Sequence, residues 1–329
     1  HIFLQFLWAS TIKLIVTKGD LVLATSTPLT IGIPALLKKW FFKTPYIFEV
    51  RDVWPEAVIA IGAIKNKLLK WLLYRLEALV YNNASFIVPL SSDMKVSIDN
   101  RFPHLRDKTS IVIPNISEIG RFHKENEEYS IINNSIGFLP RFSILYAGTF
   151  GKVNGIRYVI ELAKLTMRVD SSIIYILIGE GAEKEDIKSL AVSYGVLNNN
   201  VFVLDPVSKS ELPKWYAEAS MGSSFVIDIP ELWANSANKF FDTLAASKPV
   251  LINHEGWQMK EIQKYNVGYV LPTKINDEAV LEFVKYTQNR ELIKQQQENA
   301  IILAKQKYSL EIAVQSYEAI FQKIIGNKK

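Results

Sequence analysis

The sequence contains no cysteine and only four histidines in 329 residues. The absence of cysteine excludes disulfides and thiolate metal sites, and it is more typical of a reducing compartment than of secreted proteins. The histidines are His1, His104, His123 and His254. No two of them have the spacing of metal ligands, so a zinc enzyme is not expected.

Long hydrophobic runs are also missing. The longest uncharged stretch near the start, residues 21–37, contains Ser, Thr and two prolines, which predicts a strand, a loop and a helix instead of a membrane span. The chain also lacks the basic region and cleavage site of a signal peptide, so we expect a soluble cytoplasmic protein. Residues 1–20 look like a helix already under way and contain no initiator Met, which suggests an N-terminal truncation.

The length and the hydrophobic content of 49% favour two domains with large cores. Short β-branched runs alternate with helical segments, and this alternation predicts an α/β fold with parallel sheets covered by helices on both faces. The predicted strands are 20–25, 46–50, 86–90, 110–113, 142–146, 173–178, 201–204, 223–227, 250–252 and 268–271. The predicted helices include 31–40, 65–80, 156–167, 183–194, 210–219 and 238–246.

A polar stretch without apolar periodicity, residues 115–140, predicts the connection between the domains. The predicted organisation is an N-terminal Rossmann-like domain at 1–120 whose start is missing, a linker at 121–141, a C-terminal Rossmann-like domain at 142–310, and a helix at 311–329 that crosses back to the first domain.

Positive charge is concentrated in the first domain, where residues 1–117 contain 14 Lys and Arg against 8 Asp and Glu. The excess lies in residues 36–43 and 64–77, where Lys, Arg and Trp alternate with leucines. This composition suits an anionic membrane surface, and it equally suits a helix with a solvated basic face. Nucleic acid is not expected as a partner, because no aromatic stacking platform accompanies the charge.

Two glycine turns follow predicted strands in the second domain. In the first, Gly148 and Gly151 allow a tight turn whose free amides face an anion, and Lys152 adds a charge; plain turn chemistry is the alternative. The glycine spacing differs from that of dinucleotide-binding proteins, which disfavours NAD. In the second turn, Gly179 and Gly181 precede Lys184, for which we consider a phosphate partner or a solvated surface position.

The segment 235–250 carries the strongest signal. Asn235, Ser236, Asn238 and Lys239 gather at a predicted helix start, where Asn235 or Ser236 caps the helix and the amides and Lys239 form a diphosphate site. Asp242 lies one turn further on the same face, where a carboxylate can accept both hydroxyls of a ribose. The alternative is a capped helix with a Lys–Asp pair.

Several segments carry a family resemblance. In chain order they are FEVRDVWPEA (48–57), SSDM (91–94), IVIPN (111–115), GTFG (148–151), GEG (179–181) and NKFFDTLAASKPVLIN (238–253). Together they resemble glycosyltransferase family 4, and in particular the bacterial branch for O-antigen, capsule and colanic acid, some of whose members transfer L-fucosamine-type sugars. The resemblance implies a GT-B fold of two facing Rossmann-like domains, a nucleotide-diphosphate sugar held by the C-terminal domain, no metal, and retention of anomeric configuration.

The family motif is incomplete in this chain. Asp242 matches the second, ribose-binding acid of the E-x7-E motif, but Ala234 stands at the first. This difference shifts the expected donor contacts to Asn235, Ser236 and Lys239. The family's Arg and Lys pair in the first glycine turn is reduced to Lys152, with Thr149 nearby.

In the first domain, Arg51, Asp52 and Glu56 follow the end of a predicted strand, where α/β sheets place ligands. We expect them to bind the acceptor, with Asp52 orienting its hydroxyl; the alternative for Asp52 is an N-cap. Ser26 and Thr27 follow the preceding strand, where they line the same cleft or form a plain turn.

The sequence therefore predicts a retaining transferase that moves a hexosyl or N-acetylaminosugar from a nucleotide-diphosphate donor, expected to be a UDP-sugar, to a lipid-linked glycan acceptor. We expect it to work without cofactor or metal at the inner face of the cell membrane, in surface polysaccharide synthesis. The predicted catalytic residues are Asp52 and Lys239. The predicted donor-binding residues are Gly148, Thr149, Gly151, Lys152, Gly179, Gly181, Lys184, Asn235, Ser236, Asn238, Lys239 and Asp242. The alternatives are a non-catalytic partner protein that keeps the fold and a sugar-nucleotide epimerase.

Overall fold

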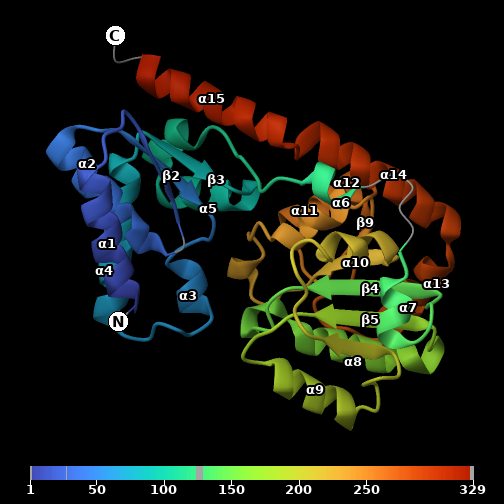
Figure 1. Ribbon diagram of the computed structural model, residues 1–329. Helices are drawn as coiled ribbons and strands as arrows, with labels where there is room; N and C mark the ends of the chain where they lie inside the picture. The colour runs from blue at the N-terminus through green and yellow to red at the C-terminus, as the bar shows by residue number, and fades with distance from the viewer. Residues whose placement is uncertain (1, 27, 124–128, 327–329) are drawn as a thin grey trace. The chain divides into compact units, whose positions relative to one another are not determined.

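The computed structural model describes residues 2–26, 28–123 and 129–326 (Figure 1). The chain divides into two compact units. The first contains His1–Pro114, Ala234–Ser236 and Glu311–Lys329, and the second contains Asn115–Trp233 and Ala237–Leu310. Each unit is built around its own parallel sheet.

The first unit has a three-stranded sheet in the order β1-β2-β3. Its strands are β1 (Val22–Thr25), β2 (Tyr46–Val50) and β3 (Phe86–Pro89). Neighbouring residues of a strand face opposite sides of the sheet, so Ile47 and Phe48 belong to different cores. Phe48 packs with residues of α2 and α4, whereas Ile47 packs with Ile320 of α15. The sheet is therefore covered on both faces, as parallel sheets require.

The helices of the first unit are α1 (Ile2–Val16), η1 (Leu29–Ile31), α2 (Gly32–Phe42), α3 (Glu56–Ala60), α4 (Lys67–Asn83), α5 (Ser92–Arg101), η2 (Pro103–Thr109) and α15 (Leu310–Gly326). Gly32 allows α2 to lie close to α4, because a Cβ at this position would be 2.5 Å from a methyl group of Val80. The helix predicted near the N-terminus is confirmed as α1.

The second unit has a six-stranded sheet in the order β6-β5-β4-β7-β8-β9, with every pair parallel. Its strands are β4 (Phe142–Ala147), β5 (Ile173–Ile178), β6 (Val201–Leu204), β7 (Met221–Ser224), β8 (Val250–Ile252) and β9 (Gly268–Val270). The chain runs outward from β4 to β6 and then returns to β7 on the other side of β4. The strand order thus reverses between β4 and β7, and open α/β sheets bind ligands at the carboxyl ends of the strands at such a point.

The helices of the second unit are α6 (Ile119–Phe122), α7 (Ile131–Ile136), η3 (Lys152–Asn154), α8 (Ile156–Val169), α9 (Lys184–Ser193), α10 (Leu212–Glu218), η4 (Pro230–Leu232), α11 (Asn238–Ala245), α12 (Trp257–Tyr265), α13 (Asp277–Gln288) and α14 (Arg290–Lys307). A capping box precedes α10, since Ser208 and Glu211 exchange side-chain to backbone hydrogen bonds of 3.2 Å in both directions.

Two segments differ from the sequence-based prediction. Residues 110–113 form no strand in the described chain; Ile113 only donates one backbone hydrogen bond to Pro89, because the segment lies beyond the end of β3. The predicted linker contains α6 and α7, and Phe122 and Ile132 from these helices are buried in the core of the second unit. Ile119, Ile131 and Ile136 also pack against this core, although the composition of the segment is mostly polar.

Within the described ranges, no helix combines the length and the apolar character needed to cross a bilayer.

Candidate functional site

The two glycine turns lie in contact at the carboxyl edge of the second sheet. Gly148 donates a backbone hydrogen bond of 2.9 Å to Ile178, and Phe150 donates one of 2.8 Å to Glu180. A Cβ on Gly179 would be 1.8 Å from the carbonyl oxygen of Gly148, and one on Gly181 would be 2.4 Å from that of Phe150. The glycines are therefore required so that the turns after β4 and β5 can pack backbone against backbone.

Three more predicted donor residues lie in the first turn. The Thr149 carbonyl accepts hydrogen bonds from the Tyr146 hydroxyl at 2.7 Å and from the Asn154 amide at 2.9 Å, which fixes the turn from inside. Gly151 precedes η3 in an extended conformation, and Lys152 begins η3 with an exposed side chain. The structure thus brings Gly148, Thr149, Gly151 and Lys152 together on one turn.

The capping prediction for α11 is wrong. The helix starts at Asn238, and Ala237 occupies the N-cap position without a side-chain hydrogen bond, so neither Asn235 nor Ser236 caps it. The reason is backbone geometry: the extended N-cap residue comes one position later than expected, and Asn235 and Ser236 group with the first unit. Asn238 is exposed, and its side-chain oxygen accepts a hydrogen bond of 2.7 Å from Asn115.

Lys239 reaches from α11 to the first glycine turn. Its Nζ lies 4.9 Å from the centre of the Tyr146 ring, and a Cβ on Gly148 would be 2.5 Å from its Cε and 2.9 Å from its Nζ. Burial of the ammonium group lowers the pKa of Lys239 to about 8, although nearby Asp242 acts in the opposite direction. In the part of the chain that the structure describes, no carboxylate forms an ion pair with Lys239. Lys239 is therefore a partly dehydrated cation without a paired carboxylate among the described residues. It lies beside the first glycine turn, where the strand order reverses.

Asp242 lies one turn further along α11. Burial raises the pKa of its carboxyl group to about 7; among its charged neighbours, Arg121 and Lys239 lower it and Glu118 raises it. No hydrogen-bond donor to this carboxyl group is present among the described residues. Its oxygens are therefore available to accept hydroxyl donors of a ligand, as the ribose prediction requires.

Lys184 does not lie at a solvated surface position. It is buried in the first turn of α9, and its Nζ lies 2.9 Å from Glu180 and 2.7 Å from Asp205. The hydrogen bond to Asp205 is the main reason why the pKa of Lys184 is raised. The prediction of a solvated surface position is therefore wrong. Glu180 and Asp205 already compensate the positive charge of Lys184 that would attract a phosphate. A phosphate contact by Lys184 stays a prediction.

Polar residues also gather at the carboxyl edge of the first sheet. Ser26 Oγ accepts a hydrogen bond of 2.9 Å from the Arg51 backbone, and Arg51 Nη1 lies 3.4 Å from Glu49 Oε1. The hydroxyl of Tyr317 in α15 donates a hydrogen bond to the other oxygen of Glu49. The sequence analysis predicted Ser26 and Arg51 as site residues. It missed Glu49 and Tyr317, because only the folded chain brings α15 next to β2. Thr27 lies outside the described residues.

Glu56 and Asp52, the remaining two predicted acceptor-binding residues, lie in different surroundings. The Glu56 carboxylate lies 2.7 Å from Arg101, which also lies 2.6 Å from the buried Glu77. Burial raises the pKa of Glu77 to about 8 and raises that of Glu56 as well. Glu56 is thus tied into an ion cluster. Asp52 is partly exposed, and it is not the N-cap of α3, because Pro55 occupies that position.

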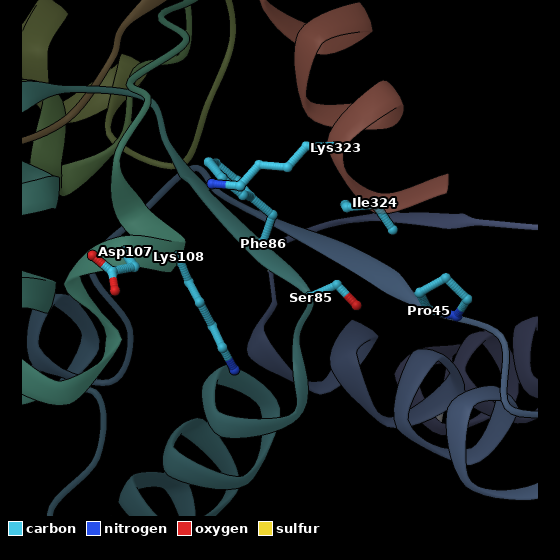
Figure 2. Close-up of a pocket in the computed structure, with 7 residues that line it drawn as sticks. All are labelled: Pro45, Ser85, Phe86, Asp107, Lys108, Lys323 and Ile324. Carbon is cyan, nitrogen blue, oxygen red and sulfur yellow. The ribbon is translucent and has the colours of Figure 1, made fainter. Parts of the chain in front are cut away.

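A cavity of about 350 Å³ at the amino edge of the first sheet contains none of the predicted site residues. Figure 2 shows Pro45 and Ser85, which precede β2 and β3, with Lys108 from η2 and Lys323 from α15 around it. Lys108 donates a hydrogen bond of 2.8 Å to the Asn82 carbonyl. In the described residues, no group of three or more His, Asp or Glu side chains is arranged to hold a metal ion.

The second unit also matches a known protein family. Residues 133–302, more than half of the chain, match the family of glycosyl transferases group 1. The chain belongs to this family. The matched region contains both glycine turns, Lys239 and Asp242, so this glycosyltransferase has the predicted donor residues inside the family domain.

Individual relatives are distant. Over 294 residues the glycosyltransferase is 21% identical to the probable glycosyltransferase WbjE of Pseudomonas aeruginosa, covering 85% of this chain and 69% of that protein. It resembles the structure of HepE from Anabaena in complex with UDP-glucose with a TM-score of 0.75 at 14% identity, covering 97% of this chain and 81% of that one. Sucrose-phosphate synthase from Thermosynechococcus elongatus gives a TM-score of 0.75 at 13% identity, over 98% and 78%. The predicted GT-B fold with two Rossmann-like domains is confirmed.

Proposed function

We propose that this glycosyltransferase moves a sugar from a nucleotide-diphosphate donor to a glycan acceptor with retention of configuration. The observation that carries the proposal is Lys239, a half-buried cation beside the Gly148 turn that no carboxylate of the described residues pairs with. A diphosphate there would receive the ammonium charge beside the start of α11, and helix starts favour phosphate. A UDP-sugar is the proposed donor, and the UDP-glucose complex of HepE supports this choice.

The reaction we propose needs no metal, because Lys239 supplies the charge that stabilises the departing diphosphate, and such stabilisation is usually the largest catalytic term. Asp242 accepts the ribose hydroxyls. The second unit offers no second carboxylate beside Lys239 in the described residues, so we propose departure and attack on the same face of the sugar. Asp52, which follows β2, is proposed to orient the acceptor hydroxyl.

The proposal extends to a hexosyl or N-acetylaminosugar donor, a lipid-linked acceptor, and surface polysaccharide synthesis in the O-antigen branch of family 4, where L-fucosamine-type sugars occur. The test is incubation with radiolabelled UDP-, GDP- and dTDP-sugars chosen by thermal shift, with and without a lipid-linked glycan. Product that forms only with acceptor supports transfer. Donor binding without product supports the non-catalytic alternative, and conversion of donor without acceptor supports an epimerase.

Donor binding is expected to be strongest between pH 7 and 8. As the pH falls through about 7, Asp242 gains a proton and loses its capacity as a hydroxyl acceptor. As the pH rises through about 8, Lys239 loses its proton and its charge. Affinity should then fall by up to about tenfold per pH unit on each side. Calorimetry measures the affinity for the selected UDP-sugar as a function of pH. A range of about pH 5.5 to about pH 9.5 extends roughly one and a half units beyond each pKa.

Matched variants assign the two limbs of that profile. Asp242→Asn should remove the acidic limb and Lys239→Met the alkaline limb, each with weaker binding throughout. A profile that stays flat in the unchanged protein, or limbs that persist in these variants, would contradict the assignment.

We further propose that the first unit docks on an anionic membrane as a peripheral protein at the cytoplasmic face. Large apolar side chains are exposed on three of its helices, among them Trp8 at 71%, Phe41 at 70% and Leu68 at 65%. A cation lies next to one of the exposed aromatic side chains of α4, because the Arg75 guanidinium is 5.4 Å from the ring centre of Trp71. Aromatic side chains paired with cations suit the lipid headgroup region, where both groups find partners.

The membrane proposal predicts salt-sensitive cosedimentation with vesicles that contain phosphatidylglycerol. Each cation near the surface contributes about 1 kcal/mol, so Lys67→Gln with Lys70→Gln should weaken binding by about tenfold or more. Lys274→Gln with Lys305→Gln removes the same charge from the second unit and serves as the control. Binding that ignores salt, or that falls equally in both double variants, would contradict the proposal.

A further inference from the structure

A second positively charged cavity lies at the amino edge of the sheet in the second unit. It has a volume of about 280 Å³ and is bordered by Phe142 and Ser220, at the starts of β4 and β7, and by the first turns of α14. The strands are parallel, so this edge is opposite to the one that carries the glycine turns. The cavity is therefore separate from the proposed donor site.

Four cationic side chains line this cavity against one carboxylate. They are Arg141, Lys248, Arg290 and Lys294, and the carboxylate belongs to Glu218. Among the cations, Arg141 is neutralised by Asp170 at 2.7 Å. The oxygens of Glu218 accept backbone hydrogen bonds of 2.8 Å from Ile131 and Ile132 at the start of α7, which hold this carboxylate in place, and its negative charge acts on Lys248.

The other three cations have no carboxylate in ion-pair contact within the described ranges. Lys248 Nζ donates a hydrogen bond of 2.7 Å to the Ala217 carbonyl, and burial lowers its pKa to about 8. Arg290 and Lys294 are exposed and lie four residues apart, so they share one face of α14. The positive charges of Lys248, Arg290 and Lys294 repel one another. An anion bound in the cavity would reduce this repulsion.

We propose that this cavity is a binding site for a small phosphate-type oxyanion, either free phosphate or the phosphoryl group of a small phosphomonoester. Arg290 offers a planar pair of donors that matches two phosphate oxygens, and point charges are added by Lys294 of the same helix and by Lys248, which precedes β8. The volume is at the lower end for ligand sites, which suits a phosphoryl group with a few attached atoms. The assignment does not depend on the proposed transferase reaction.

The test is titration of inorganic phosphate, followed by thermal shift and calorimetry, with ionic strength held constant by sodium chloride. Phosphate should raise the Tm of the unchanged protein and of Lys239→Met, because the latter alters only the other edge of the sheet. Arg290→Gln with Lys294→Gln should weaken phosphate binding by about tenfold or more, since two charge-assisted contacts are lost. Both positions are exposed, so this variant should fold normally.

Lys274→Gln with Lys305→Gln removes equal charge from the same unit and should leave phosphate binding unchanged. Glycerol 3-phosphate, added in a second series, distinguishes the sources: tighter binding than phosphate identifies a phosphomonoester site, and weaker binding identifies a free phosphate site. The proposal is overturned if chloride reproduces the Tm shift, if the Arg290 and Lys294 variant binds phosphate like the unchanged protein, or if only Lys239→Met abolishes the response.

Discussion

Lys239→Met is expected to lower the rate of sugar transfer by about 10²–10³-fold, the usual effect of removing one preorganised group that stabilises a developing negative charge. The methionine keeps most of the volume beside Tyr146 but supplies no charge to the departing diphosphate. Folding should not suffer, because burial already disfavours the ammonium form in the free protein and lowers the pKa of Lys239 to about 8. The Tm of the variant should therefore be unchanged or higher.

Transfer of labelled sugar, measured alongside thermal unfolding, checks this expectation. Lys274→Met is the matched control, because Lys274 is an exposed lysine of the same unit without a place in the proposed site. Lys152→Met should give an intermediate loss, since the exposed Lys152 reaches the same turn from solvent. Full activity in Lys239→Met, or activity lost only together with Tm, would remove Lys239 from the mechanism.

Gly179→Ala is expected to reduce the free energy of unfolding of the second unit by about 3–5 kcal/mol, the range of severe backbone and packing defects. Its φ of +155° disfavours an L side chain, and the new Cβ would be 1.8 Å from the Gly148 carbonyl oxygen. Backbone on both sides leaves no flexible side chain to move aside. Relief would require the two glycine turns to separate, so donor binding should be lost as well.

Gly195→Ala provides the control for Gly179→Ala. Gly195 also has a positive φ, +69°, but a Cβ added there would meet no atom within 4 Å. Only the backbone cost of about 1–2 kcal/mol should remain. Denaturant unfolding of both variants separates the two contributions, and equal losses would show that the contact between the turns does not matter.

The sequence predicted the strand and helix succession well because hydrophobic periodicity is local. Both glycine turns could also be located, since a turn directly after a strand leaves a local pattern. Contacts between distant segments left none: the Tyr317 hydroxyl reaches Glu49 across 268 positions, and Lys184 pairs with Asp205 across 21. The sequence therefore did not indicate that Glu180 and Asp205 pair with Lys184.

Helix caps mark another limit of the sequence. Asn235 and Ser236 have the chemistry of N-caps, but the cap position depends on which residue takes the extended backbone conformation before α11, and that residue is Ala237. The capping box of Ser208 and Glu211 was predictable because two residues at fixed spacing had to agree. A pair of matched residues constrains local geometry more than a single suitable side chain does.

The contact between the two glycine turns has a consequence for changing donor preference by mutagenesis. Where main chain packs on main chain, substitution at Gly179 or Gly181 alters stability before it alters selectivity. Variation that preserves the folded domain has room instead in side chains on the loop before α11 and on the exposed segment after β6. A library confined to residues 206–207, 209–210 and 228–232 spares Asp205 and Ser208, and it would leave the proposed diphosphate site intact while sampling new contacts to the rest of the donor.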